Sequence, residues 1–185
     1  MAQVSVGSPV EPNLRPNMQR TFSASGRAAS WEARLGMGGA PCPQFFGHGP
    51  NHRRDAIGDA EGATKDIRIC VSGAATEGEA LDVARAVSRS NLLKCAIHGE
   101  DPNWGRVLAA LGTTSAAFDP DRIGVDFNGV PVCREGAAMP VEPVVDLSPL
   151  EVAIDIDLNH GGATATLWTN DLTAMYVHEN SAYST

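Results

Sequence analysis

The sequence lacks long apolar runs and is poor in aromatic residues, which make up 5% of its 185 residues. No apolar run approaches the roughly 18 residues that a membrane-spanning helix needs. The first 30 residues also lack the apolar core of a secretory signal peptide. We therefore expect a soluble, cytoplasmic protein with no membrane partner.

Paired-cysteine motifs are also absent, because no C-x-x-C spacing occurs in the chain. We expect reduced thiols, as in a cytosolic protein, and no disulfide framework. Cys42, His48 and His52 supply only three ligands in a loop, so we do not favour a zinc site and expect no metal or other cofactor. The four cysteines are Cys42, Cys70, Cys95 and Cys133.

Positive charge is scarce outside the first part of the chain. Residues 1–55 carry six arginines and three acidic residues, a formal charge of about +3. Because the whole chain has a formal net charge of −8, the remaining residues carry about −11. Nucleic-acid binding needs clustered Lys and Arg to contact phosphates. The acidic main body therefore argues against nucleic acid as the principal partner.

Residues 1–56 differ in composition from the rest of the chain. They contain no lysine and no sustained helical or alternating pattern, and 26 of them are Ala, Gly, Pro or Arg. Three interpretations are a disordered tail, an organelle-targeting peptide, and a frame-shifted leader that is foreign to the rest, of which we favour the first and the last. We predict that residues 57–185 form the folded domain.

The first regular elements are a strand and a helix. Apolar residues alternate with polar ones over residues 67–72, which predicts a half-buried strand ended by Gly73. Thr76 and Glu79 have the spacing of a capping box, which predicts a helix that reaches about Arg89. The apolar stripe of this helix comprises Ala80, Val83, Ala84 and Val87.

A second strand and helix follow directly. The apolar run over residues 92–97 favours a strand, and Asp101 with Pro102 predicts the N-cap and first position of a helix. Gly112 is expected at a left-handed C-cap of this helix. The apolar stripe comprises Trp104, Val107, Leu108 and Leu111. Together these segments predict a βαβα unit in a mixed α/β fold with helices layered on a sheet.

Two residues of the second helix invite a functional interpretation. Gly105 costs roughly 1 kcal/mol relative to alanine inside a helix, so we expect another group to approach its backbone closely. Arg106 and the helix N-terminus could bind a carboxylate or a phosphate. The alternative is a structural unit in which the glycine permits close packing.

The second half of the chain predicts two hairpins and a short helix. Asn128-Gly129 joins two alternating segments, and Pro131 indicates an edge position or a bulge. Residues 134–149 are expected to form a loop. Residues 152–158 and 163–169 also alternate, and the turn between them predicts a second hairpin. We expect the following Asn170-Asp171 pair to cap a helix that contains Leu172, Met175 and Tyr176.

The residues alone reveal no catalytic pair, since G-x-S-x-G, P-loop, H-E-x-x-H and Rossmann glycine motifs are all missing. Four segments nevertheless resemble, in order, the C-terminal part of ornithine acetyltransferase, the bifunctional glutamate N-acetyltransferase of arginine biosynthesis. These segments are Asp59–Lys65, Gly99–Arg106, Trp168–Thr173 and Tyr176–Thr185. The resemblance extends over about residues 57–185.

The resemblance implies a layered α-β-β-α fold and an α2β2 assembly with the family's α chain. It also implies that an N-terminal threonine takes acetyl from N-acetylornithine, releases ornithine and passes the acetyl group to glutamate, with acetyl-CoA left open as a second donor. Substrate contacts fall on Glu61, Asn180 and Thr185, and a carboxylate at Glu61 suits a ligand with ammonium groups. The Gly99–Arg106 motif is then expected to support them through Asp101, Trp104, Gly105 and Arg106.

The sequence departs from the family pattern before residue 57. The segments that carry the oxyanion-hole residues and the nucleophilic threonine have no counterpart, and Thr21 is only a weak candidate nucleophile. Although Pro16-Asn17-Met18 resembles the family's cleavage site, Thr21 stands one residue too far from it. We therefore expect no acetyl transfer by this chain alone. A non-catalytic remnant, a subunit that complements a separate N-terminal half, and an organelle-targeted enzyme remain as alternatives.

Overall fold

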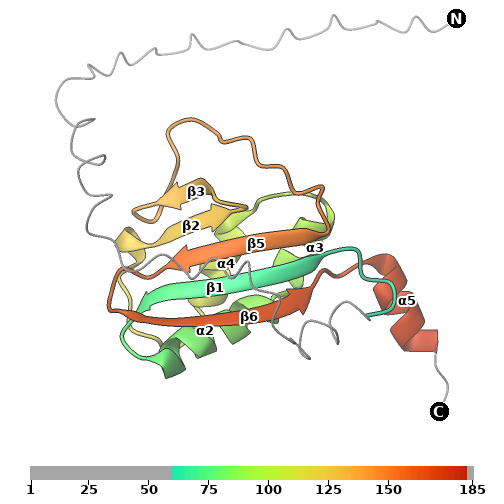
Figure 1. The fold of residues 1–185 in the computed structure, drawn as a ribbon, viewed down its shortest axis with the longest axis horizontal. Coiled ribbons are helices and arrows are strands. Elements are labelled where there is room, and N and C mark those ends of the chain that lie inside the picture. Colours follow the sequence, from blue (N-terminus) through green and yellow to red (C-terminus); the bar gives the residue numbers. More distant parts are fainter. Residues whose placement is uncertain (1–59, 183–185) are drawn as a thin grey trace, which may run out of the picture. The chain divides into compact units, whose positions relative to one another are not determined.

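The computed structural model describes residues 60–182, which form one six-stranded mixed sheet and several helices (Figure 1). The strand order is β4-β3-β2-β5-β1-β6, so the predicted mixed α/β class is confirmed. The elements are β1 (Asp66–Ala74), α2 (Glu77–Ser88), α3 (Asn91–His98), α4 (Trp104–Leu111), the 3-10 helix η2 (Pro120–Arg122), β2 (Gly124–Phe127), β3 (Val130–Arg134), β4 (Ala137–Ala138), β5 (Glu151–Asp157), β6 (Ala163–Asn170) and α5 (Ala174–Ala182).

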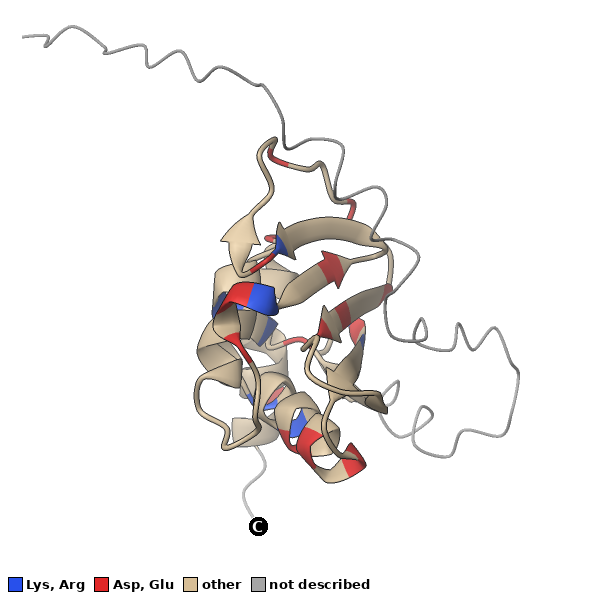
Figure 2. Cartoon of the chain, turned by 90° about the vertical axis from the view of Figure 1, so that its left-hand side faces the viewer, with Lys and Arg blue, Asp and Glu red and all other residues tan. Residues whose placement is uncertain are grey.

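Helix α2 packs on β1 and β6 and also contacts α4, so helices cover one face of the sheet (Figures 1 and 2). The predicted capping box at its start is present, with Glu79 N donating to Thr76 Oγ1 at 3.2 Å and Thr76 N donating to Glu79 Oε2 at 3.1 Å. All four predicted stripe residues of α2 are buried. The apolar side chains of β1 and β5 complete the core beneath them.

The hairpin between β2 and β3 is confirmed. Asn128 and Gly129 have φ values of 48° and 77°, which is the pair of left-handed conformations that a tight hairpin turn requires. Pro131 lies opposite Asp126, next to a register shift between Val125 and Asp126. The predicted bulge near Pro131 is therefore also present.

The strand predicted over residues 92–97 is wrong, because this segment lies within helix α3. Ser90 caps the helix and accepts a hydrogen bond from Leu93 N at 3.3 Å. Leu93, Ala96 and Ile97 are buried at the i, i+3 and i+4 spacing of a helix. A short apolar run fits a buried strand and a buried helix equally well, so periodicity could not separate them. Three helices thus follow β1 in place of the expected βαβα unit.

The second predicted hairpin is also wrong, although both of its strands are present. Strand β1 lies between them, with Ile69 paired to Ile154 of parallel β5 and to Leu167 of antiparallel β6. The turn after β5 crosses the end of β1, where His160 N and Gly161 N donate to Gly73 O at 2.8 and 2.7 Å. Alternation shows which face a strand buries, but it does not identify the neighbouring strand.

Acidic side chains outnumber basic ones over the part of the chain that the structure describes (Figure 2). Cys95 and Cys133 are free thiols as expected, whereas Cys70 is disulfide-bonded, which contradicts the expectation for that residue. Within residues 60–182, no helix is both long and apolar enough to cross a membrane.

Candidate functional site

The segments that carry two of the predicted substrate residues, Glu61 and Asn180, lie before β1 and in α5, at the end of the sheet where β1 begins and β6 ends (Figure 1). The C-terminus of α3 and the start of α5 meet these strands there. We call this region the junction and define it as Gly62–Lys65, His98 and Asp171–Thr173.

The centre of the junction is the carboxylate of Asp171, whose exposed fraction is 0%. Its Oδ1 accepts hydrogen bonds from Thr64 N at 2.8 Å and Lys65 N at 3.1 Å. Its Oδ2 accepts from Thr64 Oγ1 at 2.6 Å and lies 3.1 Å from His98 Nδ1. Hydrogen bonds to a carboxylate are stronger than neutral ones, so they hold the segment before β1 firmly against the end of β6.

These contacts also define the tautomer of His98. The hydroxyl of Thr64 donates its only hydrogen to Asp171, yet its oxygen lies 3.2 Å from His98 Nδ1. A hydroxyl that has already donated can only accept there, so Nδ1 must carry a proton. The single Nδ1–H of His98 is therefore shared between Thr64 Oγ1 and Asp171 Oδ2. The side chain of His98 is 45% exposed.

Thr173, rather than the predicted Asn170-Asp171 pair, caps helix α5. Its Oγ1 accepts a hydrogen bond from Tyr176 N at 2.8 Å and donates to Gly62 O at 2.5 Å. Gly62 has a φ of +82°. The segment before β1 is therefore joined directly to the first turn of α5.

Of the three predicted substrate residues, two are in the described part of the chain. Glu61 is exposed in a turn closed by Ala63 N donating to Ala60 O at 3.0 Å. Asn180 is exposed on α5, where its Nδ2 donates to Tyr176 O at 2.8 Å. The turn of Glu61 thus contacts the first turn of α5 through Gly62, and Asn180 lies one turn further along the same helix. Thr185 lies outside the described residues, as do Thr21, the cysteine and histidines at 42–52 and the domain boundary at 56/57.

Lys65 organises the other side of the junction, and sequence reasoning did not find this role. Its side chain is 8% exposed, and Nζ donates to the carbonyls of Leu147, Ser148 and Pro149 at 2.7, 2.8 and 3.2 Å. Glu100 Oε1 lies 3.4 Å from the same nitrogen. The ammonium group thus joins the loop before β5 to the turn after α3. A lysine in a polar turn gives no sequence signal of such burial.

A second lysine, Lys94, places a partly buried cation beside α5. Its Nζ donates to Asn170 Oδ1 at 3.2 Å and lies 5.8 Å from the centroid of the Tyr176 ring. Burial lowers the pKa of Lys94, and the nearby charge of Asp171 opposes this shift. The lysine therefore contributes a positive charge close to the exposed surface of the junction.

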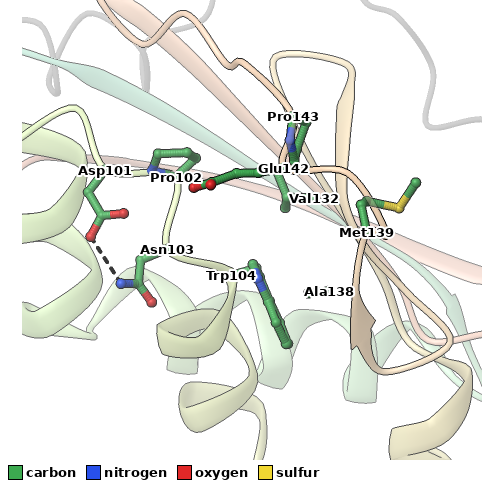
Figure 3. A pocket seen from close by; sticks show the side chains of 9 residues that line it. All are labelled: Asp101, Pro102, Asn103, Trp104, Val132, Ala138, Met139, Glu142 and Pro143. Atoms are coloured by element: carbon green, nitrogen blue, oxygen red, sulfur yellow. Dashed lines mark hydrogen bonds between the residues drawn. The ribbon is translucent and has the colours of Figure 1, made fainter. Parts of the chain in front are cut away.

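The four predicted supporting residues lie away from the junction, around the start of α4. A cavity of about 420 Å³ opens there between α4, β3 and the loop after β4, and Asp101 and Trp104 line it (Figure 3). The N-cap of α4 is Asn103, whose Oδ1 accepts from Arg106 N at 3.2 Å. The predicted cap at Asp101 is therefore two residues too early, and Asp101 instead accepts from Asn103 Nδ2 at 3.0 Å.

Two further expectations for α4 are wrong. A Cβ on Gly105 would meet only Asn103 Oδ1, at an ordinary contact distance of 3.5 Å, so among the described residues nothing crowds this backbone. Gly112 caps the helix with a right-handed φ of −61°. Arg106 donates to the carbonyl of Leu92, which joins α4 to α3. No three His, Cys, Asp or Glu residues within 60–182 are grouped to hold a metal ion.

Comparison with known proteins gives a consistent result. Residues 53–185 match the ArgJ family. The chain is 63% identical over 131 residues to arginine biosynthesis bifunctional protein ArgJ 1 of Streptomyces clavuligerus. This match covers 71% of this chain and 34% of that protein. It is 64% identical over 128 residues to ArgJ of Streptomyces coelicolor, covering 69% and 33%. The chain therefore spans about a third of the length of these curated relatives.

A solved structure supports the same relationship. The crystal structure of arginine biosynthesis bifunctional protein ArgJ from Bacillus halodurans superposes with a TM-score of 0.64 at 30% sequence identity. The match covers 70% of this chain and 63% of that one. The likeness thus extends from the sequence to the three-dimensional arrangement of the elements.

Proposed function

Because the chain belongs to the ArgJ family, we propose that it forms the C-terminal part of an acetyltransferase of arginine biosynthesis. In the proposed reaction, a threonine hydroxyl attacks the acetyl carbonyl of N-acetylornithine, and ornithine leaves as the amine. The amine of glutamate then takes the acetyl group from the threonine and restores its hydroxyl. Acetyl-CoA is a second donor to be tested in the same assay.

The ligand contacts proposed for this chain are Glu61, Asn180 and Thr185. The observation that carries this assignment is the bond from Thr173 Oγ1 to Gly62 O, since it ties the turn of Glu61 to the helix of Asn180. The carboxylate of Glu61 would pair with an ammonium group of ornithine, and the amide of Asn180 would bond a polar end of the ligand. Two polar groups held at one edge suit a small amino-acid ligand.

Three further features belong to the proposal. The Gly99–Arg106 segment, with Asp101, Trp104, Gly105 and Arg106, supports the ligand contacts indirectly, through the contact of Glu100 Oε1 with Lys65 Nζ at 3.4 Å. Residues 57–185 act as the folded domain and assemble in the cytoplasm with the family's α chain, as α2β2 in an α-β-β-α arrangement. The nucleophilic threonine then comes from the segment that precedes this region in the family.

An assay with and without the family's N-terminal region tests the proposal. We expect the purified chain alone to form no N-acetylglutamate from N-acetylornithine and glutamate, as measured by mass spectrometry. Co-production with the nucleophile-bearing segments of an ArgJ relative should give a stable complex with turnover. In that complex, Glu61→Gln should raise KM for N-acetylornithine at least about 10-fold, because a charged contact is lost.

Two outcomes would contradict the proposal. Robust turnover by the chain alone would show that its own residues supply the nucleophile. Failure to form any complex, with aggregation of the chain, would favour a non-catalytic remnant. Thr76→Ala serves as a control, because it removes a helix cap on α2 without touching the junction.

A further inference from the structure

We propose that Asp171 is a positioning residue for ligand binding: its buried carboxylate fixes the turn that carries Glu61 relative to the helix that carries Asn180. The inference rests on the proposed ligand role of Glu61. Asp171 itself is fully buried and so is not a ligand contact. Its effect on the ligand would therefore pass through the turn that it holds.

The two oxygens of Asp171 restrain the turn in different ways. Oδ1 accepts from the backbone N–H groups of Thr64 and Lys65, whereas Oδ2 accepts from the hydroxyl of Thr64. The backbone and the side chain of one residue are thus held by one carboxylate. Such a fork limits the direction of the segment as well as its distance.

The contact between Asp171 and Lys65 is made in both directions and stands at the end of a paired strand. Asp171 N lies 3.3 Å from Lys65 O, directly beyond the pairing of Asp66 with Asn170 in the β1–β6 ladder. The backbone of Asp171 therefore extends the β1–β6 ladder by one bond, and its carboxylate bonds Lys65 N in return. Because Asp171 follows a paired strand, its position is set by the sheet.

A second restraint completes the geometry two residues later. Thr173 Oγ1 bonds Gly62 O and also caps α5 through Tyr176 N. Asp171 holds the turn at its C-terminal end and Thr173 holds it at Gly62, immediately after Glu61. A binding group needs such support to keep its productive geometry within a fraction of an ångström.

Thr64 offers the mildest way to test this role. Thr64→Val removes the hydroxyl, with its bond to Asp171 and its contact with His98 Nδ1, and keeps the shape of the side chain, whereas Thr64→Ser keeps the hydroxyl. Thr113→Val is the matched control, because the hydroxyl of Thr113 donates to Ala110 O at 2.7 Å, outside the junction. A purely structural role predicts similar effects of the two valine variants.

Amide hydrogen exchange on the full chain is the first measurement. We expect Thr64→Val to speed exchange at Thr64 and Lys65 about 5-fold or more, since their N–H groups are the donors to Asp171. Exchange in α2 should stay unchanged, and Thr64→Ser should restore protection. Unchanged exchange at these two amides would overturn the inference, whatever the function of the chain.

Steady-state kinetics of the complex with the α chain of a relative is the second measurement. Thr64→Val should raise KM for N-acetylornithine about 5-fold with little change in kcat, because ground-state and transition-state binding weaken together. Thr113→Val should leave both unchanged. In a Glu61→Gln background, Thr64→Val should add nothing further, because the two changes act through one contact.

The outcomes separate this inference from the proposed function. If Glu61→Gln leaves KM unchanged, the ligand role of Glu61 is wrong. If Glu61→Gln raises KM but Thr64→Val leaves it unchanged, or adds its full effect in the double variant, the positioning role alone is wrong.

Discussion

The backbone of Gly62 lies directly against the backbone of Tyr176. A Cβ on Gly62 would stand 2.5 Å from Tyr176 N and 2.8 Å from Tyr176 Cα, so no other side chain fits there. The φ of Gly62 is +82°, a left-handed conformation that disfavours side chains for a separate reason. Glycine is therefore required twice over at the point where the turn of Glu61 meets α5.

We predict that Gly62→Ala destabilises the domain by at least about 2 kcal/mol, because conformational strain and a backbone clash add together. Gly129→Ala is the matched control. Its φ is +77°, but no atom lies within 4 Å of a Cβ built there, so only the strain of about 1–2 kcal/mol applies. Urea unfolding of both variants measures the difference. Equal losses would show that α5 moves away from Gly62 without cost.

Lys65→Met should release the loop before β5. Three carbonyls, of Leu147, Ser148 and Pro149, would lose their common donor. Leu147 is buried, and leaving a buried acceptor unsatisfied costs about 1–3 kcal/mol. We expect lower stability in urea and faster amide exchange over residues 147–151. Arg89→Met is the control, since it removes a positive charge from an exposed position. Slow exchange in this loop in the Lys65 variant would mean that other contacts hold it.

Local signals predicted the elements that depend on local chemistry. The capping box of Thr76 and Glu79 and the turn at Asn128-Gly129 were both found correctly, because neighbouring residues alone determine these structures. The strand predicted over residues 92–97 was wrong because a helix of eight residues offers too few turns to show its period. The position of β1 between β5 and β6 was not predicted, because the choice of neighbouring strand is a non-local property.

In the candidate site, too, local features could be predicted from the sequence and non-local contacts could not. The resemblance predicts ligand roles for Glu61 and Asn180, and the bond from Thr173 Oγ1 to Gly62 O joins the segments that carry them. From the sequence, Asp171 was interpreted as part of a helix cap, yet its bonds reach Thr64 and Lys65 across 107 and 106 residues. No periodic or spacing pattern encodes a contact of that length. Burial of Lys65 was hidden for the same reason.

The ion pair of Asp155 with Arg68 yields a prediction for pH dependence. Arg68 Nη2 lies 3.1 Å from Asp155 Oδ1, and the two side chains stand on the neighbouring strands β5 and β1. Burial raises the pKa of Asp155 above its usual value of 3.8, and the charge of Arg68 opposes this shift only partly. A native state with the higher pKa binds the proton more tightly than the unfolded chain. The stability contributed by Asp155 is therefore fully present below pH 3.8 and is lost as the pH rises through the raised pKa.

Asp155→Asn cannot ionise, so its stability relative to the unaltered chain should increase from pH 3.5 to pH 7. Arg68→Met should have the opposite effect and steepen the loss of stability with pH, because it removes the charge that favours the ionised carboxylate. Urea unfolding of the three proteins at each pH measures both differences, and contributions from the other titrating groups cancel. A stability difference between Asp155→Asn and the unaltered chain that stays constant with pH would show that the charge of Arg68 fully compensates the burial of Asp155.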